Sequence, residues 1–235
     1  MIPDLPLLNF ESRDALMVGV SGLMADVIGA ALSRKARVSV ALSGGSTPEP
    51  AYRALAAAAL DWSRVDLALV DDRWVAPGEA GSNETLLRSA FAAASGVTVH
   101  GLYRPGTDAA AGIAIAEDSY ARLRPFDVVL LGMGSDAHTA SWFPGSIGLA
   151  AALDPANPAT LAAVDATGCP GAQTWPHRAT LTLPAVAEAG WVGLLITGAE
   201  KRAVLEAALA SDPMLAPVRA GLEAAGPAGV VLWAP

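Results

Sequence analysis

Apolar residues recur along this chain in two alternating patterns. Between Ser12 and Lys35 they recur at three- and four-residue steps, which predicts an amphipathic helix, and the short β-branched segment Val38–Leu42 that follows predicts a strand. The alternation continues to the end of the chain. Further helices are expected at Pro48–Leu60, Ser82–Ala93, Asp108–Leu123 and Ala199–Ala210, and further strands at Val65–Val70, Val97–Tyr103, Phe126–Leu131, Leu161–Asp165, Ala179–Leu183, Trp191–Thr197 and Val230–Trp233.

This order of elements predicts an α/β fold. Strands that alternate with helices of about 10 to 15 residues form βαβ units, so we expect a mainly parallel, Rossmann-like sheet with helices on both faces. The segment Phe126–Leu131 is apolar except for Asp127, as in a strand that is covered on both faces. Pro213–Pro217 is expected to break the chain before the last strand. No repeat or long linker divides the sequence, so residues 1–235 are expected to form a single domain.

The amino-acid composition and net charge limit the kinds of molecule that this protein is expected to bind. Hydrophobic residues make up 53% of the chain and charged residues 16%, which is enough apolar material for a large core. The net charge of −8 argues against nucleic-acid binding, because that function needs a basic surface. A small anionic substrate remains compatible with it, since a few cations and backbone N–H groups can bind one phosphate locally.

Cysteine and histidine are scarce. The single cysteine, Cys169, excludes an intrachain disulfide, and three histidines without clustering make a bound metal unexpected. The N-terminal sequence MIPDLPLLNF lacks the basic and apolar regions of a signal peptide. No apolar segment is expected to reach the roughly 18 residues that cross a membrane. These features predict a cytoplasmic protein with no membrane partner.

The first polar loop follows the predicted strand Val38–Leu42. It carries two glycines that open the backbone, flanked by hydroxyl residues, and a helix follows at once, with Thr47 placed as N-cap and Pro48 as the first helical residue. Unpaired N–H groups at the positive end of a helix bind phosphate well. The alternative is an ordinary strand–helix turn. The candidate phosphate-binding residues are Ser43, Gly44, Gly45, Ser46 and Thr47.

The richest polar loop follows the predicted strand Phe126–Leu131. Gly132 and Gly134 allow a sharp turn, after which Asp136, His138, Thr139 and Ser141 stand within six residues. Ligands of open α/β sheets bind beyond the carboxyl ends of the strands, where this loop is expected. An imidazole beside an acid suggests general acid–base chemistry. The alternative is a histidine that only fixes its own loop.

Three other groups of polar residues join the candidate site. Asp71, Asp72 and Arg73 follow the strand Val65–Val70 and could bind sugar hydroxyls or stabilise negative charge, although a local ion pair explains them equally well. Ser82 fits an N-cap next to Asn83. Two later cations complete the set. Arg178 precedes a strand, and Lys201 stands near a helix N-terminus, where an anion would offset its unfavourable position.

In combination these motifs resemble the 6-phosphogluconolactonase family over nearly the whole chain. The most specific stretch is 136–145, DAHTASWFPG, which is similar to the family's DGHTASLFPG. The resemblance implies hydrolysis of 6-phosphoglucono-δ-lactone to 6-phosphogluconate, in the oxidative pentose phosphate pathway, without a cofactor. Its sister enzymes, the glucosamine-6-phosphate deaminases, share the Rossmann-like sheet but have a different sequence after the histidine.

The resemblance also implies roles for individual residues. His138 would be the general base that activates water, Asp136 would orient the imidazole or its loop, and Arg73 would stabilise the oxyanion. The phosphate and the ring hydroxyls would be bound by Ser43, Gly44, Gly45, Ser46, Thr47, Asp71, Asp72, Asn83, Gly132, Gly134, Thr139, Arg178 and Lys201. Ala137 replaces the family's usual glycine; if this position has a positive φ, alanine costs about 1 kcal/mol.

Two alternative functions stay open from the sequence. An isomerase or deaminase acting on an amino-sugar phosphate would use a carboxylate such as that of Asp72 to move a proton between carbons. A catalytically silent sugar-phosphate sensor would keep the pocket without turnover. The sequence leaves the choice between monomer and homodimer open.

Overall fold

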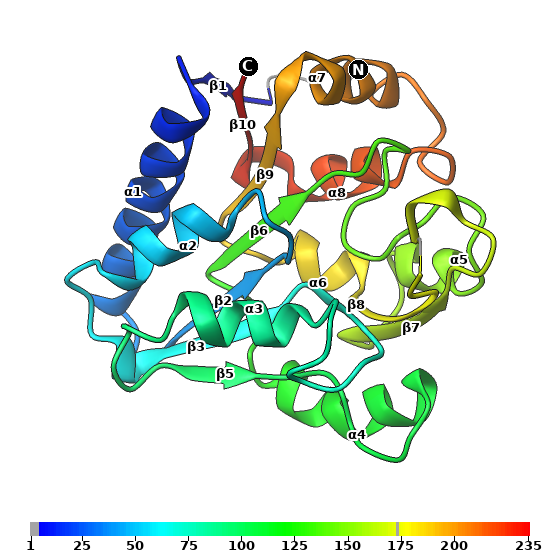
Figure 1. Ribbon diagram of the computed structural model, residues 1–235, viewed down its shortest axis with the longest axis horizontal. Helices are drawn as coiled ribbons and strands as arrows, with labels where there is room; N and C mark the ends of the chain where they lie inside the picture. Colours follow the sequence, from blue (N-terminus) through cyan, green and yellow to red (C-terminus); the bar gives the residue numbers. More distant parts are fainter. Residues whose placement is uncertain (1–4, 173) are drawn as a thin grey trace.

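The computed structural model of the protein describes residues 5–172 and 174–235, and its centre is a seven-stranded sheet (Figure 1). The strand order is β1-β10-β9-β6-β2-β3-β5, and every neighbouring pair is parallel. The predicted α/β fold with a mainly parallel, Rossmann-like sheet is therefore confirmed. The strands are β1 (Leu7–Asn9), β2 (Val38–Leu42), β3 (Val65–Leu69), β5 (Thr98–His100), β6 (Val128–Gly132), β9 (Val192–Thr197) and β10 (Gly229–Ala234).

Helices cover both faces of this sheet. Figure 1 shows α1, α2 and α3 on one side and α6 and α8 on the other. The central strands β2 and β3 are buried along their whole length, because helices pack on them from both sides. The helices are α1 (Arg13–Leu32), α2 (Glu49–Ala56), α3 (Asn83–Ala90), α4 (Ala109–Ala121), α5 (Leu149–Leu153), α6 (Leu183–Ala187), α7 (Gly198–Ala208) and α8 (Pro217–Ala225), with short 3₁₀ turns at Trp62–Arg64, Pro170–Ala172 and Gly226–Ala228.

A second, antiparallel sheet lies beside the first. It has the order β4-β8-β7, formed by Asp71–Arg73, His177–Leu181 and Leu161–Asp165. The strands expected at Leu161–Asp165 and Ala179–Leu183 are thus formed as β7 and β8, in a separate antiparallel sheet that the sequence did not predict. Buried side chains of β7 and β8 belong to the same hydrophobic cluster as those of the large sheet, so the two sheets share one core.

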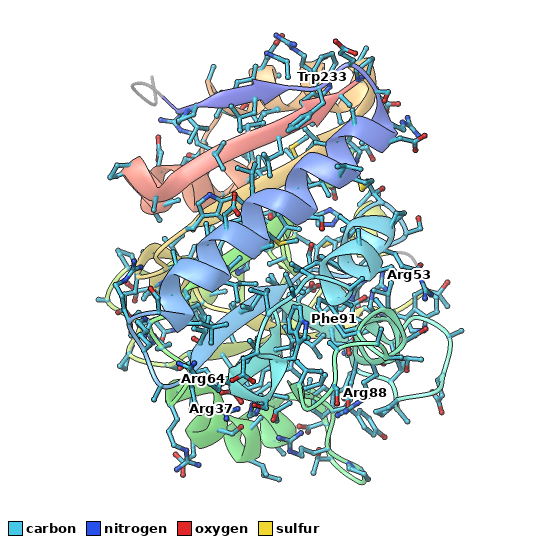
Figure 2. The ribbon with its side chains drawn as sticks, turned by 90° about the vertical axis from the view of Figure 1, so that its left-hand side faces the viewer. Arg37, Arg53, Arg64, Arg88, Phe91 and Trp233 are labelled. Atoms are coloured by element: carbon cyan, nitrogen blue, oxygen red, sulfur yellow. The ribbon has the colours of Figure 1, made fainter. Side chains whose placement is uncertain are left out.

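Helix α1 corrects another expectation. Its 20 residues have a mean hydropathy of 1.9 in their most apolar window, so by length and composition alone the helix could cross a membrane. In the fold it lies across the large sheet, as Figure 2 shows. It buries Leu16, Val20, Met24 and Ile28 against that sheet. A core helix of this kind passes the same composition test as a membrane span.

The N-terminus of α3 agrees with the sequence prediction, and that of α2 does not. Ser82 caps α3 as expected, since its Oγ accepts a hydrogen bond from the N–H of Thr85. Thr47 does not cap α2: the N-cap is Pro48, without a side-chain cap, and the helix begins at Glu49. Helix α8 was not expected, because the prolines around it were interpreted as a break. Pro217 is instead its first residue, where the missing N–H costs nothing.

Candidate active site

The candidate site lies where the strand order reverses. From the central strand β2 the chain moves outward through β3 to β5 and then returns to β6 on the other side of β2. The loops after β2 and β6 therefore leave neighbouring strands at one edge, the usual ligand position in open α/β sheets. A cavity of about 280 Å³ opens there. The predicted site residues that line it are Ser43, Gly44, Gly45, Thr47, Asp71, Arg73, Asn83, Gly132, Gly134, His138, Arg178 and Lys201.

His138 and Asp136 form a hydrogen-bonded pair beside this cavity. Nδ1 of His138 lies 2.5 Å from Oδ1 of Asp136, and the same oxygen accepts the backbone N–H of His138. Burial alone would raise the pKa of Asp136, but the hydrogen bond and charge of His138 outweigh burial and lower it. A carboxylate on Nδ1 leaves Nε2 as the free ring nitrogen. The geometry therefore suits a base that acts through Nε2.

The ring of Phe143 supports the imidazole from the side. The two ring centroids are 4.3 Å apart, and the guanidinium of Arg178 lies 5.0 Å from the centroid of Phe143. Phe143 is 1% exposed and also lines the cavity. The sequence motif contained this residue, but no periodicity indicated that it would stack on His138.

Arg73 reaches the cavity from the edge strand β4. Its Nη1 donates to the carbonyl of Gly81 at 2.7 Å, and its guanidinium lies over the ring of Trp175. The Nε–H is buried and has no acceptor among the described residues. The guanidinium is thus fixed in position and keeps an N–H donor without an acceptor among the described residues, which suits the binding of an anion.

Arg178 and Asp71 form a buried polar cluster with Ser141. Arg178 donates from Nε to the carbonyl of Trp175 and from Nη2 to that of Ala172, while Nη1 lies 3.8 Å from Oδ2 of Asp71. Burial lowers the pKa of Arg178 to about 10. The guanidinium is still charged at neutral pH, and two of its donor groups already bind protein.

The loop after β2 has the features of a phosphate site. Gly45 has a φ of +105°, and a side chain at Gly44 would overlap Asn83, so glycine is required at both positions. In the part of the chain that the structure describes, the backbone N–H groups of residues 44–47 have no protein acceptor. Lys201 lines the same cavity and donates from Nζ to the carbonyl of Met133 at 2.9 Å. Burial lowers the pKa of this ammonium group.

Four predicted residues do not line the cavity. Asp136 does not reach the cavity itself but is hydrogen-bonded to Nδ1 of His138, which does. Ser46 is exposed and faces a neighbouring groove. Thr139 is fully buried and donates to the carbonyl of Gly132. Asp72 is 1% exposed, and its carboxylate accepts the N–H groups of Arg73, Asn83 and Glu84 at the start of α3, although burial raises its pKa to about 7.

The backbone at Ala137 is left-handed. Its φ is +61°, and that of Ala140 is +50°. Position 137 therefore has the positive φ for which alanine, in place of the family's usual glycine, costs about 1 kcal/mol. Nevertheless the pair of His138 and Asp136 is formed.

The comparisons with known proteins agree with this geometry. Residues 11–233 match the family model described as glucosamine-6-phosphate isomerases/6-phosphogluconolactonase. The chain belongs to this family. Among curated relatives, the 6-phosphogluconolactonase of Rhizobium meliloti is 39% identical over 96% of this chain and 97% of its own, and that of Xylella fastidiosa (strain Temecula1) is 37% identical over 92% and 91%.

Solved structures of family members have the same fold. The crystal structure of a 6-phosphogluconolactonase from Shewanella baltica superposes with a TM-score of 0.92 over the full length of both chains, at 34% identity. That of Trypanosoma brucei superposes with a TM-score of 0.81 at 26% identity, over 98% of this chain and 96% of the other. The family resemblance expected from the motifs is confirmed.

Proposed function

We propose that this protein hydrolyses 6-phosphoglucono-δ-lactone to 6-phosphogluconate in the oxidative pentose phosphate pathway. One observation carries the proposal: the pair of His138 and Asp136 borders the same cavity as the backbone N–H groups of residues 44–47, which have no acceptor among the described residues. A base and an anion site in one cavity fit a substrate that joins a reactive carbonyl to a phosphate. The named activities of the relatives support the same reaction.

In this reaction His138 acts as the general base. Its Nε2 takes a proton from water while the water oxygen bonds to the lactone carbonyl carbon, and Asp136 stabilises the resulting imidazolium through Nδ1. The tetrahedral intermediate then collapses, the bond between the carbonyl carbon and the ring oxygen breaks, and the imidazolium returns the proton to that oxygen. Acid–base catalysis of this kind typically contributes about 10²- to 10⁴-fold.

The cations divide between the two ends of the substrate. Arg73 lines the cavity, and its Nε–H has no acceptor among the described residues, so the guanidinium is assigned to the developing oxyanion. Lys201 and the N–H groups of residues 44–47 are assigned to the phosphate. Among the described residues that line the cavity, the cations Arg73, Arg178 and Lys201 outnumber the one carboxylate, Asp71, so the cavity is locally positive in a protein with a net charge of −8.

The placement of Asp72 disfavours the deaminase alternative. That reaction needs a free carboxylate in the cavity to move a proton between two carbons, whereas Asp72 is buried at the start of α3 and bonded to three backbone N–H groups. The carboxylate that does line the cavity, Asp71, is held by Ser141 and Arg178: its Oδ2 accepts a hydrogen bond from Oγ of Ser141 and lies 3.8 Å from Nη1 of Arg178. We therefore expect no ammonia release from glucosamine 6-phosphate. A small-molecule substrate and a soluble, cytoplasmic enzyme remain part of the proposal.

The proposal is tested by measuring hydrolysis of freshly generated lactone above the spontaneous rate. The wild type is compared with His138→Ala and with His177→Ala, a matched control because the His177 side chain is 64% exposed at the start of β8. We expect His138→Ala to lower kcat by about 10²- to 10⁴-fold and His177→Ala to leave it unchanged.

Each alternative has its own result. No excess hydrolysis by the wild type rejects the lactonase, and calorimetric binding of 6-phosphogluconate would then favour a sensor. Wild-type hydrolysis that survives in a folded His138→Ala variant retains the reaction but rejects His138 as its base.

A further inference from the structure

The loop between β7 and β8, described over residues 166–172 and 174–176, places Gly171 in the lining of the candidate site. It closes on itself through a hydrogen bond from the N–H of Ala166 to the carbonyl of Pro176, and its 3₁₀ turn spans Pro170–Ala172. Ala166 and Ala172 form a small hydrophobic cluster with Val164 and Phe143. Because Phe143 also stacks on His138, the loop is packed against the imidazole through this ring.

Arg178 fixes the position of this loop. Its Nε and Nη2 bind the carbonyls of Trp175 and Ala172, at 2.6 and 3.1 Å, from a side chain that is almost fully buried. Arg178 itself belongs to β8, in the antiparallel sheet. These two hydrogen bonds therefore hold the short turn at residues 170–172 in a defined position relative to the core.

Within this turn, Gly171 meets the pair of His138 and Asp136. A Cβ built on Gly171 would overlap Oδ2 of Asp136 and would lie 2.9 Å from Nδ1 of His138, a separation that carbon atoms of this kind essentially never have. The other oxygen, Oδ1, is the one that bonds His138. The bare backbone of Gly171 thus provides the space that the Asp136 carboxylate occupies.

The nearest atoms to a Cβ at this position all belong to the pair. Asp136 has a short side chain, so its carboxylate can avoid a Cβ at Gly171 only by rotating, and rotation breaks the bond to Nδ1. The pair is also bounded by Gly134, where a Cβ would overlap His138. Two glycines that are far apart in sequence therefore confine one hydrogen bond.

We infer that Gly171 is a positioning residue: its lack of a side chain, on a turn held by Arg178, keeps Asp136 bonded to Nδ1 of His138. This inference rests on the proposed function for its catalytic consequence, but the geometric claim is independent of any substrate. It assigns a role in the reaction to the turn of residues 170–172.

The experiment compares three variants with the wild type. Gly171→Ala is the test, and Asp136→Ala removes the carboxylate that the new methyl group would displace. Gly168→Ala is the control for loop strain: it also adds a methyl group to this loop, where a Cβ would meet no atom within 4 Å, and its φ of +85° makes a side chain there cost about 1 kcal/mol. Thermal unfolding and near-ultraviolet circular dichroism establish that each variant is folded.

The first readout needs no substrate. Nitrogen NMR of the histidine rings reports the Nδ1 hydrogen bond, and the spectrum is simple because the chain has three histidines. We expect the His138 signals to move toward those of Asp136→Ala in Gly171→Ala and to stay at their wild-type positions in Gly168→Ala. Unchanged His138 signals in Gly171→Ala would overturn the inference, whatever reaction the protein catalyses.

The second readout is lactone hydrolysis in a double-mutant cycle. Displacement of a catalytic group by a fraction of an ångström to 1 Å typically costs up to about 10²-fold, so we expect Gly171→Ala to lower kcat by about 10- to 100-fold with little change in KM. When Asp136→Ala is already present, Gly171→Ala should change kcat by less than about twofold. Effects that multiply, or an equal loss in Gly168→Ala, would show that loop integrity is responsible and would reject the role of Gly171. A wild type without lactonase activity rejects the proposed function alone.

Discussion

Ser141 donates a hydrogen bond from Oγ to Oδ2 of Asp71, with 2.5 Å between the two oxygen atoms. The bond joins the loop that carries His138 to the edge strand β4 that carries Arg73. Both partners are buried, and Nη1 of Arg178 lies 3.8 Å from the same carboxylate oxygen. A hydroxyl thus shares a buried carboxylate with a guanidinium, so three segments of the site are fixed relative to one another.

The first prediction concerns this bond. Ser141→Ala leaves a buried carboxylate oxygen without its hydroxyl donor, and the free energy of unfolding should fall by about 1–3 kcal/mol. Urea denaturation measures the change. Ser146→Ala is the control, because Ser146 donates to a backbone carbonyl in a partly buried position, and its loss should cost about 1 kcal/mol or less.

A double-mutant cycle separates the bond from general packing. If the hydroxyl acts on the carboxylate, Ser141→Ala and Asp71→Ala should show a coupling free energy of about 1 kcal/mol or more. Additive losses would contradict a direct interaction and would leave packing as the cause.

The second prediction concerns the two alanines in left-handed backbone. Ala140 is partly exposed, so Ala140→Gly should relieve the strain and raise the free energy of unfolding by about 0.5–1 kcal/mol. Ala137 is 7% exposed and belongs to the core, so Ala137→Gly also loses a buried methyl group worth about 0.8 kcal/mol and should change stability less. Chemical denaturation of both variants gives the comparison. A larger gain at position 137 than at position 140 would contradict this ranking.

The sequence allowed prediction of the parts that rest on periodicity. Helix α1 and the buried strands β2, β3 and β6 follow from spacing, because their apolar residues are packed by the sheet that the same spacing creates. Strand β4 has three residues, two of them acidic, and is held by pairing with β8, far along the chain. No local pattern can indicate such a strand.

The candidate site divides in the same way. The motif around His138 was visible because its residues stand together in the sequence. The role of Asp72 at the start of α3 depends on where α3 lies, so the adjacent acids looked equivalent until the fold placed Asp71 in the cavity and Asp72 outside it. Gly171 had no signal at all, since its importance is the absence of atoms next to a carboxylate from another loop.

The third prediction concerns Lys201. If its ammonium group binds the substrate phosphate, Lys201→Met should raise KM for the lactone by about 10- to 100-fold and change kcat much less, because a charge-assisted hydrogen bond is lost from binding. Lys35→Met is the control, since the chain has two lysines and Lys35 pairs with Asp127. Calorimetry with 6-phosphogluconate adds a pH test. Burial lowers the pKa of Lys201, so its ammonium group loses its proton at a lower pH than that of an ordinary lysine. As the pH rises, the affinity for 6-phosphogluconate should therefore start to fall at that lower pH. An unchanged KM in Lys201→Met would remove this residue from the phosphate site.

The last prediction concerns stability in acid and the carboxylate of Asp66 on β3. Burial alone would raise the pKa of Asp66, but hydrogen bonds from Arg37, at 2.7 and 2.8 Å, and from His100 outweigh burial and lower it. Figure 2 places Arg37 beside Arg64 at one end of the molecule, where half of the Arg37 side chain is exposed to water. A carboxyl group with a lowered pKa binds fewer protons in the folded state than in the unfolded state. Its contribution is therefore complete above the ordinary carboxyl pKa of about 4 and is lost as the pH falls through the lower folded value.

Asp66→Asn should accordingly destabilise the protein by about 1–2 kcal/mol at pH 7, a figure reduced for the exposure of Arg37. The difference from the wild type should shrink below about pH 4. Urea denaturation from pH 7 to pH 3 measures it, with Asp26→Asn as the control because Asp26 is an exposed residue of α1. A destabilisation by Asp66→Asn that is the same at pH 3 and pH 7 would mean that packing of the side chain, and not its charge, stabilises this end of the sheet.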